Sequence, residues 1–238
     1  FKDTTGSGIG DLRGIIEKIP YLKELGIDMV WLNPFYPSPQ HDNGYDIADY
    51  TAVDPDFGTM ADFEEMIAVG QEYGIEFMLD MVLNHCSTDH EWFQKALTGV
   101  KFYQDFFILR DEPTDWVSKF GGTAWAPFGD TGKYYLRLYD ITQADLNWRN
   151  PHVRDELFKV VNFWKDKGVK GFRFDVINVI GKDEVLEDCP INDGKPAYTD
   201  RPITHDYLHM LNQASFGQDP TFMTVGEMSS TTIENCIL

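Results

Sequence analysis

The sequence predicts an α/β fold in which amphipathic helices alternate with short, buried, parallel strands. Residues 12–25 carry apolar side chains at helical spacing and lead through Gly26 into the apolar run 28–32. Apolar residues three and four apart are typical of a helix with one buried face, and a short apolar run is typical of a strand covered on both sides. This order recurs three times. The expected helices are 12–25, 60–73, 153–167 and 204–216, and the expected strands are 28–32, 75–79, 171–174 and 222–225.

A polar side chain follows each expected strand. The four are Asn33, Asp80, Asp175 and Glu227. Parallel (β/α)8 barrels place their chemistry at the carboxyl ends of the strands, and doubly wound open sheets bind ligands there too. The repeated helix and strand unit favours the barrel. We therefore expect an incomplete (β/α)8 TIM barrel that holds about strands 2–5.

The spacing of these strand ends predicts an insertion. The stretch between Asp80 and Asp175 is longer than the stretches between the other neighbouring strand ends. The excess is roughly the length of one further helix-and-strand unit of a barrel. The excess predicts a small inserted domain after the third strand, at 86–145, where aromatic and turn-forming residues gather. The barrel then covers 1–85 and resumes over 146–238, where it stops after the fifth strand.

The charge balance excludes some partners. The chain has 39 acidic and 20 basic side chains and a formal net charge of −19. Such a surface repels phosphate backbones and anionic lipids, so we expect neither a nucleic acid nor a membrane as partner. There is no run of about 18 apolar residues, and the 3 cysteines lack metal-ligand spacing. Reduced thiols predict a cytoplasmic protein; the oligomeric state stays open.

Asp175 and Glu227 form the candidate catalytic pair. Arg173 stands two residues before Asp175 in an expected strand, so both side chains point to one face. We expect the guanidinium to lower the pKa of Asp175 and keep it ionised. Two carboxyls across a cleft are what glycoside hydrolysis needs, one as nucleophile and one as acid. Taken alone, such carboxylates more often cap helices or form ion pairs.

Four segments resemble the short sequence regions of the α-amylase family of glycoside hydrolases. In chain order they are 80–85 (DMVLNH), 143–148 (QADLNW), 171–175 (GFRFD) and 225–227 (VGE). Their order and spacing fit the family, and the resemblance runs from Asp3 to the last residue. It implies a barrel with an inserted domain and hydrolysis that retains the anomeric configuration.

The resemblance also implies roles for the residues of the candidate pair. Asp175 is expected to be the nucleophile and Glu227 the general acid/base, while Arg173 and His85 hold the glucosyl unit and the nucleophile. Retention requires carboxyls roughly 5 to 5.5 Å apart. Glu227 must be protonated to act as the acid, which requires a less polar environment than that of Asp175.

Further sugar contacts follow from the same resemblance. Asp42 is expected to accept hydrogen bonds from sugar hydroxyls, and Tyr45 to stack on the apolar face of the glucose. Phe120 and Tyr139 resemble the aromatic wall that the family's inserted domain contributes. Outside this context Tyr45 would be a packing aromatic and His85 a core histidine.

Residues 3–11 form a candidate ion-binding loop. Side-chain oxygens alternate along it, and the candidate ligands are Asp3, Thr5, Ser7, Ile9 and Asp11. Relatives that bind calcium there carry Asn and Asp where this chain has Thr5 and Ser7, so one carboxylate is missing. Calcium is therefore an option, no cofactor is required, and the other interpretation is a Gly-rich turn capped by Asp3 and Asp11.

The motifs also indicate a subgroup and a substrate. Segment 143–147 resembles the oligo-1,6-glucosidase subfamily, and segments 3–8, 38–45, 118–122 and 223–232 are most similar to its phosphotrehalases. The expected reaction is hydrolysis of α,α-trehalose 6-phosphate to glucose and glucose 6-phosphate. The partner is thus a small sugar or sugar phosphate. One alternative is an oligo-1,6-glucosidase or dextran glucosidase acting on isomalto-oligosaccharides, and a remote one is a non-catalytic binding relative of the fold.

Two parts of the expected site, the phosphate contacts and a third catalytic carboxylate, are not identified by the motifs of this chain. Lys182, Lys195 and Arg201 are either phosphate contacts or solvated loop charges, and the family's phosphate contacts lie largely in later segments. A third family carboxylate, after the seventh strand, also has no counterpart here. We therefore expect the N-terminal part of a longer enzyme, inactive or nearly so on its own.

Overall fold

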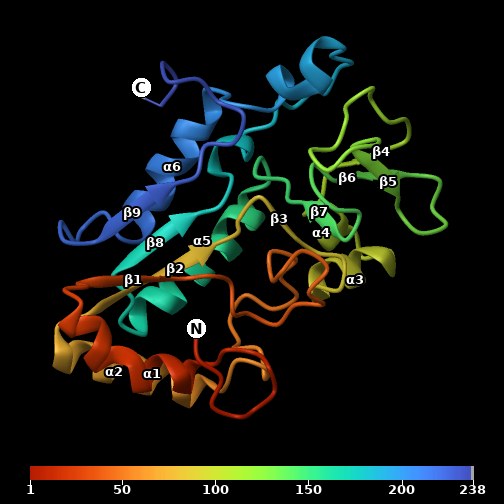
Figure 1. Ribbon diagram of the computed structural model, residues 1–238. Coiled ribbons are helices and arrows are strands. Elements are labelled where there is room, and N and C mark those ends of the chain that lie inside the picture. Colours follow the sequence, from red (N-terminus) through yellow and green to blue (C-terminus); the bar gives the residue numbers. More distant parts are fainter. Residues whose placement is uncertain (237–238) are drawn as a thin grey trace.

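The computed structural model describes residues 1–236 and confirms the alternation of helices and parallel strands (Figure 1). The main sheet has the order β1-β2-β8-β9, and all its neighbours are parallel. Its strands are β1 (Met29–Leu32), β2 (Glu76–Met81), β8 (Gly171–Phe174) and β9 (Met223–Gly226). The helices that precede them are α1 (Leu12–Glu24), α2 (Met60–Tyr73), α5 (Pro151–Asp166) and α6 (Ile203–Ala214).

The strand order distinguishes the two α/β architectures. Once the small strands of the insertion are set aside, each strand of the main sheet pairs with the next one along the chain. A doubly wound sheet reverses its order partway, whereas a (β/α)8 barrel does not. The sheet is therefore part of a barrel, as predicted. One detail differs, because Asp80 lies inside β2 and not after it.

Local signals explain where the helices begin and end. Asp11 caps α1 by accepting a hydrogen bond from the Gly14 amide. Thr59 and Asp62 form a reciprocal capping box at the start of α2, which ends at Gly74 in a left-handed conformation (φ 64°). Side-chain oxygens at these positions satisfy amides that the first helical turn leaves unpaired.

Residues 85–145 form two small antiparallel sheets beside the main sheet (Figure 1). One joins β3 (His85–Ser87) to β7 (Gln143–Asp145), so the segment leaves the barrel and returns to it through a single ladder. The other has the order β4-β6-β5. Its strands are β4 (Leu109–Arg110), β5 (Trp125–Pro127) and β6 (Tyr134–Leu136), and two short helices, α3 (Glu91–Leu97) and α4 (Lys101–Gln104), precede them.

A buried ion pair fastens this segment to the barrel. Lys182, which follows β8, is 3% exposed, and its Nζ lies 2.7 Å from the carboxylate of Asp145 on β7. Asn84 joins the pair, because it accepts from Lys182 and donates to Asp145 at 3.0 Å. Lys182 is therefore neither a solvated loop charge nor a free phosphate contact. The interpretation of Lys182 from the sequence was wrong because the partners of this lysine are distant from it in the chain.

The close approach of α2 and β2 generates a first prediction. A Cβ on Gly70 would lie 2.5 Å from the Phe77 ring and 2.8 Å from the carbonyl of Ile75. Gly70→Ala should destabilise the full-length protein by about 1–3 kcal/mol through overpacking, although alanine favours a helix over glycine by about 1 kcal/mol. Urea unfolding measures the change. The exposed Ala68 on the same helix supplies the control, since Ala68→Gly should cost at most about 1 kcal/mol. A stabilised Gly70→Ala protein would contradict the packing argument.

The buried pair generates a second prediction. Lys182→Met leaves the Asp145 carboxylate buried without its cation, so the free energy of unfolding should fall by about 3–5 kcal/mol. Adding Asp145→Asn removes the stranded charge and should restore part of the loss. Lys159→Met, at an exposed pair with Glu156, is the matched control and should change stability by less than about 1 kcal/mol. Equal losses in the free energy of unfolding for the two lysine variants would show that the buried pair contributes no more to stability than the exposed pair.

Candidate active site

The centre of the site is Arg173, whose guanidinium contacts three carboxylates. Its Nη1 lies 2.8 Å from both oxygens of Asp80 and 2.7 Å from Oδ1 of Asp175. Its Nη2 lies 2.9 Å from Oε2 of Glu227. These carboxylates come from β2 and from the ends of β8 and β9, so one cation joins three neighbouring strands.

Strand register explains why the four groups meet. Asp80 pairs with Arg173, and Arg173 pairs with Val225. Alternate residues of a strand share one face, so Asp175 and Glu227, each two residues further on, follow that row. The structure thus brings the predicted pair together at the carboxyl end of the sheet.

The pKa of Asp175 is raised, which is opposite to the predicted direction. Burial of the carboxyl is the main cause, and the charge of Asp80 adds to it, while Arg173 acts in the other sense. The prediction was wrong because it left out the burial of the carboxyl and counted one neighbour of Arg173, whereas three carboxylates share the single guanidinium. Asp175 therefore ionises less readily than an ordinary aspartate.

Glu227 is the more exposed member of the pair. Its side chain is 44% exposed, whereas that of Asp175 is 9% exposed. β9 is an edge strand of the described sheet, so among the described residues Glu227 has a neighbouring strand on one side. The expectation that Glu227 has the less polar surroundings stays a prediction. The 5 to 5.5 Å carboxyl separation stays a prediction.

Val176 links the two carboxyls through its backbone. It adopts a left-handed conformation (φ 40°, ψ 39°), which is unusual for a β-branched residue. Its amide donates to Oε2 of Glu227 at 3.1 Å. Backbone strain of this kind is concentrated at functional sites, and here it turns the chain sharply after Asp175.

The predicted sugar contacts lie around this centre. The Tyr45 hydroxyl donates to Asp80 at 3.1 Å, and its ring lies 5.8 Å from the Arg173 guanidinium carbon. A carboxylate oxygen of Asp42 accepts from the Gln143 amide at 2.9 Å. Gln143 therefore connects the inserted segment to the loop that carries Asp42 and Tyr45.

His85 and the aromatic residues form a continuous group. The His85 ring lies 5.2 Å from that of Tyr139, which lies 5.7 Å edge-on from Phe120. Burial lowers the pKa of His85 to about 4, so the imidazole is neutral at physiological pH. Phe120 is 57% exposed and Tyr139 is buried, so Phe120 is the ring available to a ligand.

Three residues beside the predicted set also belong to this geometry. Asp80 binds Arg173, Gln143 binds Asp42, and the half-exposed Trp31 ring lies 5.3 Å from the Arg173 guanidinium carbon. Asp80 and Gln143 stand in two of the recognised motifs, so a signal for them existed. Trp31 lies in the first expected strand, and neither motif nor charge distinguished it.

The loop 3–11 lies outside this cluster. Asp3 accepts the amides of Thr5, Gly6 and Gly8, and Asp11 accepts those of Thr4 and Gly14. All four carboxylate oxygens thus accept backbone amides of the loop or of the first turn of α1. No group of three His, Cys, Asp or Glu side chains within 1–236 is arranged to hold a metal ion. Calcium binding at this loop stays a prediction.

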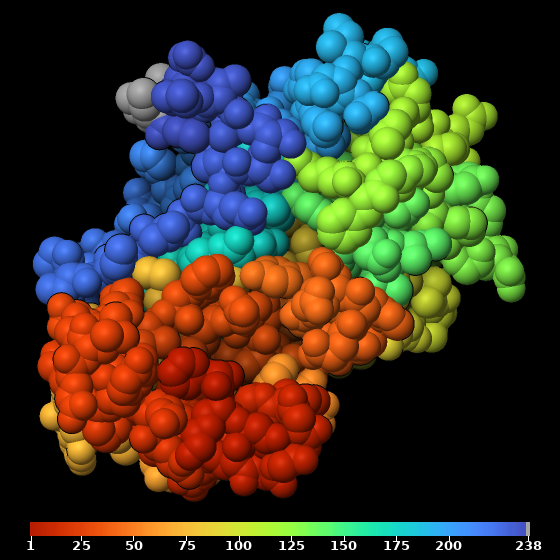
Figure 2. Space-filling model, in the orientation of Figure 1, coloured from red at the N-terminus to blue at the C-terminus, as the bar shows by residue number. Residues whose placement is uncertain are grey.

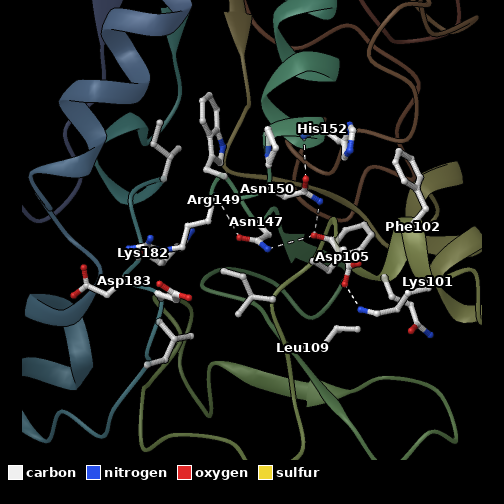
Figure 3. A pocket seen from close by; sticks show the side chains of 18 of the residues that line it. Lys101, Phe102, Asp105, Leu109, Asn147, Arg149, Asn150, His152, Lys182 and Asp183 are labelled. Atoms are coloured by element: carbon white, nitrogen blue, oxygen red, sulfur yellow. Dashed lines mark hydrogen bonds and ion pairs between the residues drawn. The ribbon is translucent and has the colours of Figure 1, made fainter.

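A separate hollow of about 770 Å³ lies between α4, the start of α5 and the loop 180–186. Figure 3 shows Asn147 and Asn150 turned toward Asp105, whose carbonyl accepts from both, and Lys182 and Arg149 on the opposite side. None of the predicted catalytic or sugar-binding residues lines it.

Within the described residues, no helix has the length and apolarity needed to cross a membrane.

Comparisons with known proteins agree with this geometry. The family model for the α-amylase catalytic domain matches residues 1–238. Trehalose-6-phosphate hydrolases of Bacillus subtilis and Escherichia coli are 49% and 52% identical, over 100% and 99% of this chain. An oligo-1,6-glucosidase of Halalkalibacterium halodurans is 43% identical over 98% of it. The chain spans 43% and 44% of the two trehalose-6-phosphate hydrolases, less than half their length.

A solved structure gives the same result. The crystal structure of Bacillus licheniformis trehalose-6-phosphate hydrolase matches with a TM-score of 0.96 and 52% identity, over 100% of this chain and 44% of that one. The parallel sheet, the inserted segment and the carboxylates around Arg173 therefore have one common explanation. This chain belongs to the α-amylase family, within its catalytic domain.

Proposed function

We propose that the protein to which this chain belongs is a retaining α-glucoside hydrolase that cleaves α,α-trehalose 6-phosphate to glucose and glucose 6-phosphate. The observation that carries the proposal is the placement of Asp175 and Glu227 on one guanidinium at the ends of neighbouring strands. The identities of about half with two trehalose-6-phosphate hydrolases support the choice of substrate.

The geometry supports a two-step reaction. Asp175 attacks the anomeric carbon while the bond to the leaving oxygen breaks, and Glu227 gives that oxygen its proton. Water then attacks the glycosyl ester, and Glu227 takes the proton of the water. Arg173 stabilises the ionised form of Asp175, while neutral His85, Tyr45 and Asp42 are placed to hold the glucosyl unit.

A second candidate is an oligo-1,6-glucosidase acting on isomalto-oligosaccharides. It is favoured by the 43% identity with an oligo-1,6-glucosidase, which falls only a little below the identities given above. Both candidates use the same catalytic pair and differ in the sugar that leaves. A non-catalytic binding role is disfavoured, because Arg173, Asp175 and Glu227 are present and in contact.

The substrate assignment predicts a clear preference. The full-length protein should hydrolyse trehalose 6-phosphate with a kcat/KM at least about tenfold above its value for isomaltose. The expected reason is that a site built to bind a phosphate leaves those groups unpaired with a neutral sugar. Glucose release measures both rates. Activity on isomaltose alone would remove this proposal and favour the second candidate.

The two-step reaction also predicts the configuration of the glucose that water releases from the glycosyl ester. Proton NMR early in the reaction should show this glucose as the α-anomer. Initial release of β-glucose would contradict the catalytic assignment.

The roles of the two carboxyls predict different failures. With 4-nitrophenyl α-glucoside the leaving group departs without a proton, so Glu227→Gln should still form the glycosyl ester and then stall. Rapid mixing should therefore show a burst of 4-nitrophenol from Glu227→Gln and none from Asp175→Asn. On trehalose 6-phosphate, loss of the acid should cost about 100-fold to 10,000-fold. A burst from Asp175→Asn would reverse the assignment.

A further inference from the structure

Two segments that the sequence analysis singled out separately meet beside Glu227. Lys119 belongs to the inserted segment, and its Nζ donates to Ser229 at 2.8 Å and Ser230 at 3.0 Å. The serines are the second and third residues after Glu227 along the chain. In Figure 2 the inserted residues, in yellow-green, border the C-terminal residues, in dark blue. The contact places a lysine and two hydroxyls on one side of the predicted acid.

The serine loop is held in place by Asn178. The Asn178 amide donates to the carbonyl of Ser229 at 3.0 Å and accepts from the amide of Ser229 at 2.9 Å. Ser230 adopts a left-handed conformation (φ 59°), which turns the chain tightly there. The backbone of the loop is therefore fixed by contacts of its own, and Lys119 binds it only through hydroxyls.

Lys119 lacks the carboxylate partner that four other cations of this region have. Arg173 and Lys182 contact carboxylates, as do Arg201, which pairs with Asp183 at 2.7 Å, and Lys195, which lies 3.6 Å from Asp193. Among residues 1–236, no carboxylate lies within ion-pair distance of Lys119. Its positive charge is thus left for an anion that the described residues do not supply.

A buried polar atom nearby is also unpartnered. The Tyr139 hydroxyl is buried and has no hydrogen-bond partner within the described residues. The ring of Tyr139 packs on that of Phe120, the neighbour of Lys119, and the Lys119 backbone amide donates to the carbonyl of Leu138 at 2.8 Å. Unsatisfied buried hydroxyls are uncommon, and a ligand is one way to satisfy them.

We propose that Lys119, together with Ser229 and Ser230, binds the phosphate monoester of the leaving-group sugar. This inference rests on the proposed function, and it deepens it by naming the residues that read the phosphate. The leaving sugar lies on the side of Glu227, because Glu227 protonates the oxygen that joins the two sugars. A phosphate there accepts hydrogen bonds from the ammonium group and from both hydroxyls.

The net charge of the chain favours a role for a local cation beside the leaving sugar. The chain carries a net charge of −19, which opposes the approach of a phosphate dianion. Burial lowers the pKa of Lys119 to about 8, with Lys195 acting in the same sense and Glu227 against it. At neutral pH the ammonium form still predominates, and a neighbouring phosphate stabilises it further.

Lys119→Met in the full-length protein tests the proposal. It should lower kcat/KM for trehalose 6-phosphate by about 10-fold to 100-fold, mainly through KM, as expected for a lost charge-assisted contact in ground and transition states alike. Its kcat/KM for 4-nitrophenyl α-glucoside should change by less than about 3-fold, because that substrate has no phosphate. Lys119→Arg should restore most of the loss. Lys133→Met, at an exposed lysine of the same segment, is the matched control and should change neither rate.

Product inhibition separates this inference from the proposed function. With 4-nitrophenyl α-glucoside as substrate, glucose 6-phosphate should inhibit the wild-type protein at least about tenfold more tightly than glucose, and Lys119→Met should abolish that difference. An equal loss on both substrates, or an unchanged difference in inhibition, would overturn the role of Lys119. A wild-type protein that fails to hydrolyse trehalose 6-phosphate would instead refute the proposed function, whatever the inhibition shows.

Discussion

The structure depends on one guanidinium that three adjacent strands share. Arg173 on β8 lies beside Asp80 on β2 and holds Asp175 and Glu227, so the register of three parallel strands and the positions of both catalytic candidates are coupled. A lysine could not substitute, because its point charge lacks the planar fork that meets several carboxylates at once. Burial of the Asp175 carboxyl raises its pKa, and the charge of Asp80 adds to this effect, because three carboxylates share one cation.

The inserted segment depends on a second charge pair. The ladder of β3 and β7 brings Asp145 next to Asn84, and Lys182 reaches them from the end of the following barrel strand. This pair fixes the base of the segment from which Gln143 contacts Asp42 and Lys119 contacts the serine loop. The positions of the residues that the inserted segment contributes to the site therefore depend on this buried pair.

The sequence was informative where structure follows from local pattern. Apolar periodicity predicted the bounds of α1, α2, α5 and α6 to within two residues. The motifs identified Asp175, Glu227, Arg173 and His85 as residues of one candidate site. It failed where long-range contacts decide. The burial of Lys182 and the raised pKa of Asp175 depend on residues from other strands. Spacing within one segment carries no information about such neighbours.

The left-handed turn at Val176 brings a main-chain donor to the oxygen of Glu227 that Arg173 also contacts. The Val176 amide and Nη2 of Arg173 both lie within hydrogen-bond distance of Oε2. Two donors on one oxygen, one from the main chain and one from a neighbouring strand, restrict rotation of the carboxyl group. The orientation of the Glu227 side chain therefore depends on the backbone turn that follows Asp175.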